Sequence, residues 1–220
     1  MSSALTGKRR DAPARRRPRA KRMARAERSA QIRDCAVQIF ARQGIGHANH
    51  SQVAEEAGVS LPTLFYHYPD HASLTKAVLT KVTHFLLDTI GRSAIEEGSG
   101  GIEAIERILI RLAGSLDAHR DLVAIWLDWS TARSSETWTD YLAFNDDARK
   151  LVEPLVAQAQ IDGEADPALD VSAASRVVVG MAHMVAQMNL TARPFSEIET
   201  AVHRLTEGYF GSRWQGERKK

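Results

Sequence analysis

The sequence of 220 residues lacks the features that define several common protein classes. Its single cysteine, Cys35, excludes an internal disulfide and a cysteine-built zinc module. The longest apolar run, from Leu122 to Leu127, is far shorter than the ~18–20 residues of a membrane-spanning helix. Glycine and proline together occupy 21 positions, too few for a collagen-like chain, and 44% of the residues are hydrophobic. An ordinary folded domain remains, with enough residues for a sizeable core.

Catalytic and metal-binding signatures are also missing. The sequence has no Gly-x-Ser-x-Gly turn, no phosphate-binding loop and no His-Glu-x-x-His motif. The pair His47 and His50 has no acidic partner nearby, and the pair His67 and His71 straddles a proline. We therefore expect no enzyme activity, no cofactor and no metal. The basic N-terminus is not followed by an apolar segment, so we expect no secretory signal and a cytoplasmic location.

Positive charge is concentrated at one end of the chain. Residues 1–28 hold eleven Lys and Arg against two acidic residues, whereas the other 192 residues hold 18 basic and 25 acidic ones. Such an asymmetry suggests an arm that binds a polyanion, and we expect residues 1–24 to be disordered until bound. DNA is the favoured partner. The alternatives are that the arm binds an anionic membrane or that it is an inert tail. The expected DNA contacts in the arm are Arg9, Arg10, Arg15, Arg16, Arg17 and Arg19.

The spacing of apolar residues predicts an all-α protein of about nine helices. We find no convincing alternating strand pattern and no internal repeat. Asn49 with Gln52, Ser60 and Asp70 are placed to cap three of the helices, and Gly58 to end one. The expected helices cover residues 25–43, 50–57, 61–68, 71–91, 102–118, 121–132, 135–162, 167–191 and 195–214.

Two short helices around Gly58 form the most informative unit. A glycine-containing turn between short helices lets the second helix project as a ridge that fits the major groove of B-DNA. The second helix carries no Asn, Gln or Arg, the types that read bases bidentately, so specificity would come partly from DNA shape and from the arm. The alternative is a purely structural helical corner. We expect Leu64, Phe65 and Tyr68 to face inward, and Leu61, Pro62, Thr63, Tyr66 and His67 to face outward.

These residues resemble a known family. The segments Phe40–Gly44, Val53–Ser60 and Thr63–Pro69 are similar to the TetR family of transcription factors, over about residues 28–78. The motif Trp126-Leu127-Asp128-Trp129-Ser130, followed by Trp138, resembles the LuxR/HapR branch of that family, the quorum-sensing master regulators of vibrios. The resemblance implies an N-terminal DNA-binding domain (25–70), a connecting helix (71–91) and a larger regulatory and dimerisation domain (92–220).

The resemblance also implies DNA contacts and a homodimer that reads two half-sites of a pseudo-palindromic operator. By position, Ser60, Thr63, Tyr66 and His67 would be contacts of the reading helix, with His50 and Ser51 near phosphate. The quorum-sensing branch usually has Asn in place of Tyr66, so its operator should not be transferred. The last two helices would pair across the dimer, and their small and Met residues suit close packing, although ordinary core is the other interpretation. The expected interface residues are Val177, Gly180, Met181, Met184 and Val185.

A ligand pocket is implied in the regulatory half. Trp126, Tyr141 and Asn145 match pocket positions of the branch, with Trp129 and Leu86 placed less securely. An apolar, aromatic pocket with one amide suits a small, mostly apolar ligand, but these tryptophans could simply fill the core.

We therefore expect a cytoplasmic, nucleoid-associated quorum-sensing-type regulator that represses or activates, with RNA polymerase as a further partner. Two alternatives remain. One is a TetR-type repressor released from DNA by a metabolite or drug. The other is an all-α enzyme or lipid-binding protein with a basic tail.

Overall fold

The computed structural model describes residues 24–98 and 100–211, and these are helical, with no strand among them. The rod formed by α4, η1 and α5 is continuous, so it counts as one helix and the described ranges hold nine, which confirms the prediction. The elements are α1 (Arg25–Gln43), α2 (His50–Glu56), α3 (Leu61–His67), α4 (His71–His84), the π-helix η1 (Phe85–Arg92), α5 (Ser93–Glu96), α6 (Gly101–Gly114), α7 (Leu116–Thr131), α8 (Trp138–Ile161), α9 (Val171–Leu190) and α10 (Phe195–Phe210).

Local side-chain chemistry sets the ends of the short N-terminal helices. The side chain of Asn49 accepts from the amide of Gln52, whose side chain accepts from the amide of Asn49, as the sequence predicts. Asp70 and Ser73 form the same reciprocal pair at the start of α4, and the Ser60 side chain accepts from the backbone N–H of Thr63 at the start of α3. Gly58 has φ +62°, a conformation that costs other residues energy, and it turns the chain between α2 and α3. The helix–turn–helix follows directly from these four signals.

Several later boundaries differ from the predicted ones. The helix predicted over 102–118 ends at Gly114, and α7 begins at once with Leu116. The backbone of His119 is not helical (φ −135°, ψ 25°), so the regular part of α7 starts after it, close to the predicted start at 121. The predicted end of the last helix at 214 lies outside the described residues.

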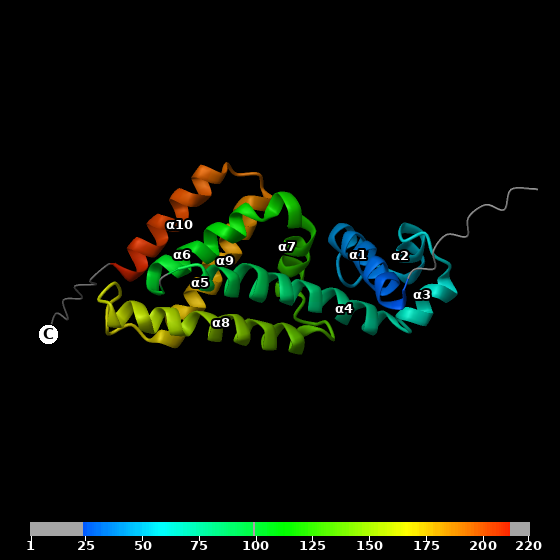
Figure 1. Ribbon diagram of the computed structural model, residues 1–220, viewed down its shortest axis with the longest axis horizontal. Coiled ribbons are helices and arrows are strands. Elements are labelled where there is room, and N and C mark those ends of the chain that lie inside the picture. Colours follow the sequence, from blue (N-terminus) through cyan, green and yellow to red (C-terminus); the bar gives the residue numbers. More distant parts are fainter. Residues whose placement is uncertain (1–23, 99, 212–220) are drawn as a thin grey trace, which may run out of the picture.

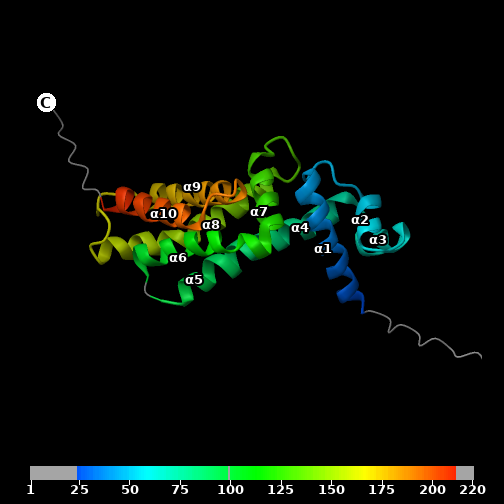
Figure 2. The same cartoon turned by 90° about the horizontal axis from the view of Figure 1, so that it is seen from above.

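Helices α1, α2 and α3 lie at one end of an elongated molecule (Figures 1 and 2). The rod of α4, η1 and α5 runs from this end along the larger helical body. In the body, α6, α8 and α9 pack against one another, and α10 packs against α6 and α9. Helix α7 contacts α9 on one side and both α1 and α4 on the other, so it joins the body to the N-terminal end.

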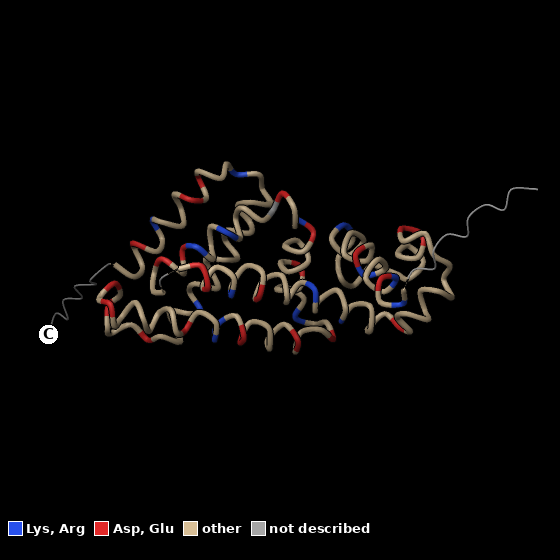
Figure 3. The backbone as a smooth tube through the Cα atoms, in the orientation of Figure 1, with Lys and Arg blue, Asp and Glu red and all other residues tan. Residues whose placement is uncertain are grey.

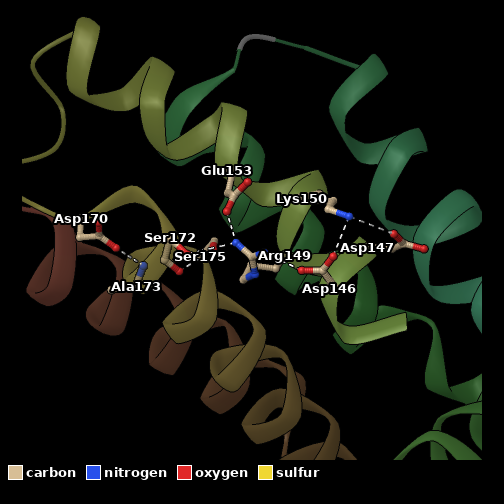
Figure 4. A network of polar contacts seen from close by, with 9 residues as sticks. All are labelled: Asp146, Asp147, Arg149, Lys150, Glu153, Asp170, Ser172, Ala173 and Ser175. Atoms are coloured by element: carbon tan, nitrogen blue, oxygen red, sulfur yellow. Dashed lines mark hydrogen bonds and ion pairs between the residues drawn. The ribbon is translucent and has the colours of Figure 1, made fainter. Parts of the chain in front are cut away.

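Polar contacts reinforce the packing of α8 against α9 (Figure 4). Arg149 pairs with Asp146 at 2.5 Å and with Glu153, and it donates to the hydroxyl of Ser172 at 3.1 Å. Lys150 and Arg149 hold the pKa of the Asp146 carboxyl below its usual value, through hydrogen bonds. Along the described chain, Lys and Arg are interspersed with Asp and Glu (Figure 3), in contrast to the basic composition of residues 1–28.

Candidate DNA-binding surface and internal cavity

Helix α3 is anchored by one side chain and presents most of the others to solvent. Leu64 is fully buried, whereas Tyr66 is 63% exposed and Leu61 and Pro62 are also exposed. The hydroxyls of Ser60 and Thr63 lie 2.8 Å apart at the start of the helix. The outward face of this seven-residue helix therefore combines apolar groups with hydroxyls, as expected for a surface that meets bases and phosphates.

The prediction that Phe65 faces inward is wrong. Phe65 is 43% exposed, because a helix of only seven residues offers one buried row and Leu64 fills it. Its ring stacks on His50 from the start of α2, with centroids 4.8 Å apart and planes at 14°. A ring nitrogen of His50 lies 3.2 Å from the carbonyl oxygen of Tyr68. His50 thus supports an exposed aromatic side chain on α3, a role that sequence spacing did not indicate.

The N-terminal part of α1 is attached to the end of α3. The guanidinium of Arg25 lies 4.9 Å from the centre of the Tyr66 ring, a cation–π contact. The hydroxyl of Ser29 is 2.8 Å from Nδ1 of His67, and the hydroxyl of Tyr68 donates to the Ser29 carbonyl at 2.9 Å. The described chain therefore begins directly beside α3.

Burial, together with the charges of Arg25 and Arg28, lowers the pKa of His67. The ring is therefore neutral near neutral pH, with one nitrogen engaged by Ser29, and it can offer a phosphate at most a neutral hydrogen bond. Ser51, on α2, is exposed on the first turn. The six arginines expected in the arm, from Arg9 to Arg19, lie outside the described residues.

The residues expected at the dimer interface divide into two groups. Val177 is 37% exposed, Gly180 is exposed and Met184 is half-buried, so these can meet a second copy. Met181 and Val185 are buried in their own protomer, because they point from α9 toward the body's core. On α10, Leu205 is 37% exposed, a residue that sequence spacing did not indicate.

A cavity of about 60 Å³ lies inside the helical body, with an apolar lining. Of the five residues predicted to line a ligand pocket, Leu86 and Trp126 line this cavity, whereas Trp129, Tyr141 and Asn145 are not among its lining residues. Trp129 instead packs in the core against Tyr141 and Phe144. The walls come from η1, α6, α7, α8 and α9, and include Leu86, Ile90, Gly91, Leu109, Trp126 and Leu151.

Polar groups near the cavity are few. The indole nitrogen of Trp126 is buried and has no hydrogen-bond partner among the described residues, which is costly for a donor. The Trp126 ring lies 4.3 Å from the ring of His183, whose Nδ1 donates to the Val179 carbonyl at 2.9 Å. The other ring nitrogen of His183 is 3.4 Å from the hydroxyl of Tyr141. Burial lowers the pKa of His183, which favours the neutral ring at this place.

Comparison with known proteins identifies this arrangement. Residues 32–78 match the family described as bacterial regulatory proteins, tetR family. The chain is 32% identical to the HTH-type transcriptional regulator LuxR of Vibrio harveyi over 152 residues, which is 67% of this chain and 71% of that protein. The chain belongs to the TetR family of transcriptional regulators. Members of the TetR family bind DNA through this helix–turn–helix and are not enzymes.

Solved TetR-family structures share the fold. A TetR-family regulator from Agrobacterium tumefaciens has a TM-score of 0.74 at 10% identity, covering 85% of this chain and 100% of that one. The fatty acid degradation regulator FadR from Bacillus halodurans has a TM-score of 0.69 at 20% identity (81% and 94% covered). The ketosteroid regulator KstR2 of Mycobacterium tuberculosis has a TM-score of 0.66 at 17% identity (82% and 93% covered). At these identities the likeness shows the fold alone.

Two further observations apply only to the described part of this TetR-family chain. Within residues 24–98 and 100–211, no three His, Cys, Asp or Glu side chains are grouped so as to hold a metal ion. No helix of these ranges is both long enough and apolar enough to cross a bilayer.

Proposed function

We propose that the protein is a homodimer that binds a pseudo-palindromic operator, with its basic N-terminal arm adding phosphate and minor-groove contacts. The observation that carries this proposal is the attachment of α1 to α3, through Arg25 on Tyr66 and Ser29 on His67. Because of this attachment the arm is connected to the chain next to α3, so the arm and α3 can contact the same duplex. The exposed face of α9 and α10, with Val177, Gly180 and Leu205, supports pairing of two copies.

Within the family, we propose a quorum-sensing-type regulator that acts on chromosomal DNA in the cytoplasm. The 32% identity to LuxR of Vibrio harveyi and the motif from Trp126 to Ser130 support this assignment. Tyr66 departs from the Asn usual in that branch, so the operator itself is expected to differ.

Apolar contact is the mode of base reading that this surface favours. Leu61, Pro62 and Phe65 are exposed on α3, and its face offers no amide or guanidinium for bidentate hydrogen bonds. In the major groove, the group that such side chains recognise is the 5-methyl of thymine. We therefore propose that each half-site is read in part by contacts with thymine methyl groups.

Selection of duplexes from a random pool with the full chain tests this function. Enrichment of one inverted repeat is expected. Replacing thymine by deoxyuridine in the half-sites should weaken binding by about fivefold to tenfold for each methyl group that the protein touches. Phe65→Ala should show a smaller difference in affinity between the thymine and uracil duplexes, because Leu61 and Pro62 remain to contact methyl groups. Recovery of unrelated sequences alone would reject sequence-specific binding.

Substitutions on the reading helix provide a second check. Thr63→Ala and Tyr66→Ala should each reduce discrimination between the selected duplex and a scrambled one by about tenfold. Each removes a hydroxyl from the proposed DNA-facing side, and Tyr66→Ala also removes the ring that Arg25 contacts. Their melting temperatures should stay near that of the parent protein, since both side chains lie outside the buried core. Thr139→Ala, an exposed threonine on α8, is the matched control. Unchanged discrimination in both variants would exclude α3 as the reading element.

A repressor released by a small molecule is the second candidate function. The apolar cavity and the unpartnered indole N–H of Trp126 favour it. At about 60 Å³ the cavity is smaller than the ~300–1,000 Å³ of ordinary ligand sites, so a ligand would have to push its walls apart. One of those walls is η1, the continuation of α4, which runs to the DNA-binding end.

Thermal-shift screening with apolar molecules that carry one hydrogen-bond acceptor tests this candidate. Trp126→Phe keeps an aromatic ring and removes the N–H donor. It should therefore lower the affinity for a ligand of this cavity by about tenfold or less, the contribution of one hydrogen bond. The same molecule should release the parent protein from the selected duplex. If no compound raises the melting temperature, or a bound compound leaves the DNA complex intact, release by a ligand is rejected.

A further inference from the structure

The motif from Trp126 to Ser130 has two sides in the structure. Trp126 and Trp129 are 3% and 2% exposed and face the core of the helical body. Asp128 lies between them in sequence and is exposed on the side that meets the N-terminal end. One carboxylate oxygen of Asp128 accepts a hydrogen bond from the backbone N–H of Ile45 at 2.9 Å. The two residues are 83 positions apart, so this contact joins α7 to the loop between α1 and α2.

The loop that Asp128 holds controls where the helix–turn–helix begins. Gly44 ends α1 with φ +88°, and its N–H donates to the carbonyl of Phe40 at 2.8 Å. The side chain of Ile45 is buried at 5% exposure, and Asn49, four residues on, caps α2. A contact to the backbone of Ile45 therefore fixes both the end of α1 and the start of α2 against α7.

The position of Asp128 within α7 indicates that the role of its carboxylate is the contact with Ile45. Asp128 lies in the last turn of the helix, which ends at Thr131. The C-terminal end of a helix carries partial negative charge, so a carboxylate there is unfavourable for the helix itself. A hydrogen bond from an N–H to an ionised carboxylate is stronger and more directional than a neutral one, which offsets that cost.

We propose that Asp128 is a positioning residue that sets the orientation of the DNA-binding end on the dimer body, and thereby the half-site spacing that the protein accepts. The proposal rests on the proposed dimeric, operator-binding function. In a dimer the two reading helices are carried by separate DNA-binding ends, and the distance between them follows from how each end is held on its body. Successive base pairs are about 3.4 Å apart, so a small rotation of each end changes the spacing that fits.

Binding to duplexes of altered spacing tests the proposal with the full chain. The probes are the inverted repeat obtained from the random pool and two derivatives with one base pair added to, or removed from, the centre. The parent protein should bind both derivatives at least about tenfold more weakly. Asp128→Ala should reduce that preference to about twofold to threefold, with its melting temperature unchanged or slightly lowered, because the loss of the hydrogen bond from the Ile45 N–H counters the removal of an unfavourable charge from the helix. Asp128→Asn keeps a carbonyl acceptor and should retain most of the preference.

Asp140→Ala is the matched control, because this exposed carboxylate of α8 lines the same groove as Asp128 and its removal changes the charge equally. It should increase affinity for all three duplexes alike and leave the spacing preference intact. The proposal is overturned if Asp128→Ala keeps the spacing preference of the parent protein, or if Asp140→Ala loses that preference to the same extent.

Hydrogen exchange of the Ile45 amide separates this inference from the proposed function. The amide should exchange slowly in the DNA-free parent protein and at least about tenfold faster in Asp128→Ala, with no change at the core amide of Val123. Equal exchange in the two proteins would refute the positioning contact even where DNA binding is specific. Failure to enrich any duplex, with the exchange difference present, would instead refute the proposed function and with it the role in spacing.

Discussion

Deletion of residues 1–22 should lower the affinity for the selected duplex by at least on the order of a hundredfold at physiological salt. The deletion removes nine Lys and Arg and one Asp. If about half of the nine cations each neutralise one phosphate, the slope of log affinity against log salt becomes shallower by about four. The structure supports so large an effect because Arg25, at the start of α1, lies on Tyr66 of the reading helix.

Fluorescence anisotropy at four salt concentrations from about 0.05 to 0.3 M measures this effect. The helical circular dichroism should be unchanged, because the removed residues precede α1. Two full-length controls separate charge from chemistry. Changing the six arginines from Arg9 to Arg19 to Lys should preserve most of the salt slope. Changing the same six to Gln should reproduce about two thirds of the change in slope that the deletion causes, because three of the nine cations remain. Equal affinity and slope before and after the deletion would mean that the arm is an inert tail.

Trp129→Ala should produce the largest loss of stability that we predict. Trp129 is 2% exposed, packs against Tyr141 and Phe144, and donates from its indole nitrogen to the Thr137 carbonyl at 3.0 Å. Truncating a fully buried tryptophan typically costs about 3–5 kcal/mol. For a protein of this size that corresponds to a fall in melting temperature on the order of 10 °C.

Differential scanning calorimetry at fixed protein concentration checks this value. Leu142→Ala on α8 is the control, since that side chain is 51% exposed and should change the melting temperature only slightly. If Trp129→Ala melts within about 2–3 °C of the parent protein, the shift expected for 1 kcal/mol, Trp129 contributes little to the core.

The N-terminal architecture could be predicted from the sequence because short-range chemistry determines it. Asn49, Ser60 and Asp70 cap helices through atoms three residues away, and Gly58 supplies a backbone angle that few residues adopt. Such signals need no knowledge of what packs against the segment. The later helices carry fewer of them, and their predicted ends were displaced by several residues.

Side-chain direction was harder to predict where neighbouring elements decide it. Phe65 was expected inside, but α3 buries Leu64 alone and His50 of α2 supports the exposed ring. Met181 and Val185 follow Val177 at the spacing of one helix face, which predicted that all three lie at an interface. The structure instead buries Met181 and Val185 in the core of the helical body. Helical spacing shows that two faces exist and leaves open which partner each face meets.

Long-range contacts left no signal in the sequence. The hydrogen bond from Ile45 to Asp128 links positions 83 residues apart, and the residues around each give no hint of the other. The same holds for the contact between Ser29 and His67, which attaches α1 to the reading helix. Both contacts bear directly on how the DNA-binding end is held, so the structure was needed to see them.

The mass of the complex on the selected inverted repeat tests the central claim most directly. We predict two chains per duplex, together with an affinity for a single half-site that is lower by at least about a hundredfold at the same salt concentration. One chain per duplex, with equal affinity for the half-site and the full repeat, would contradict the account of a dimer that reads two half-sites.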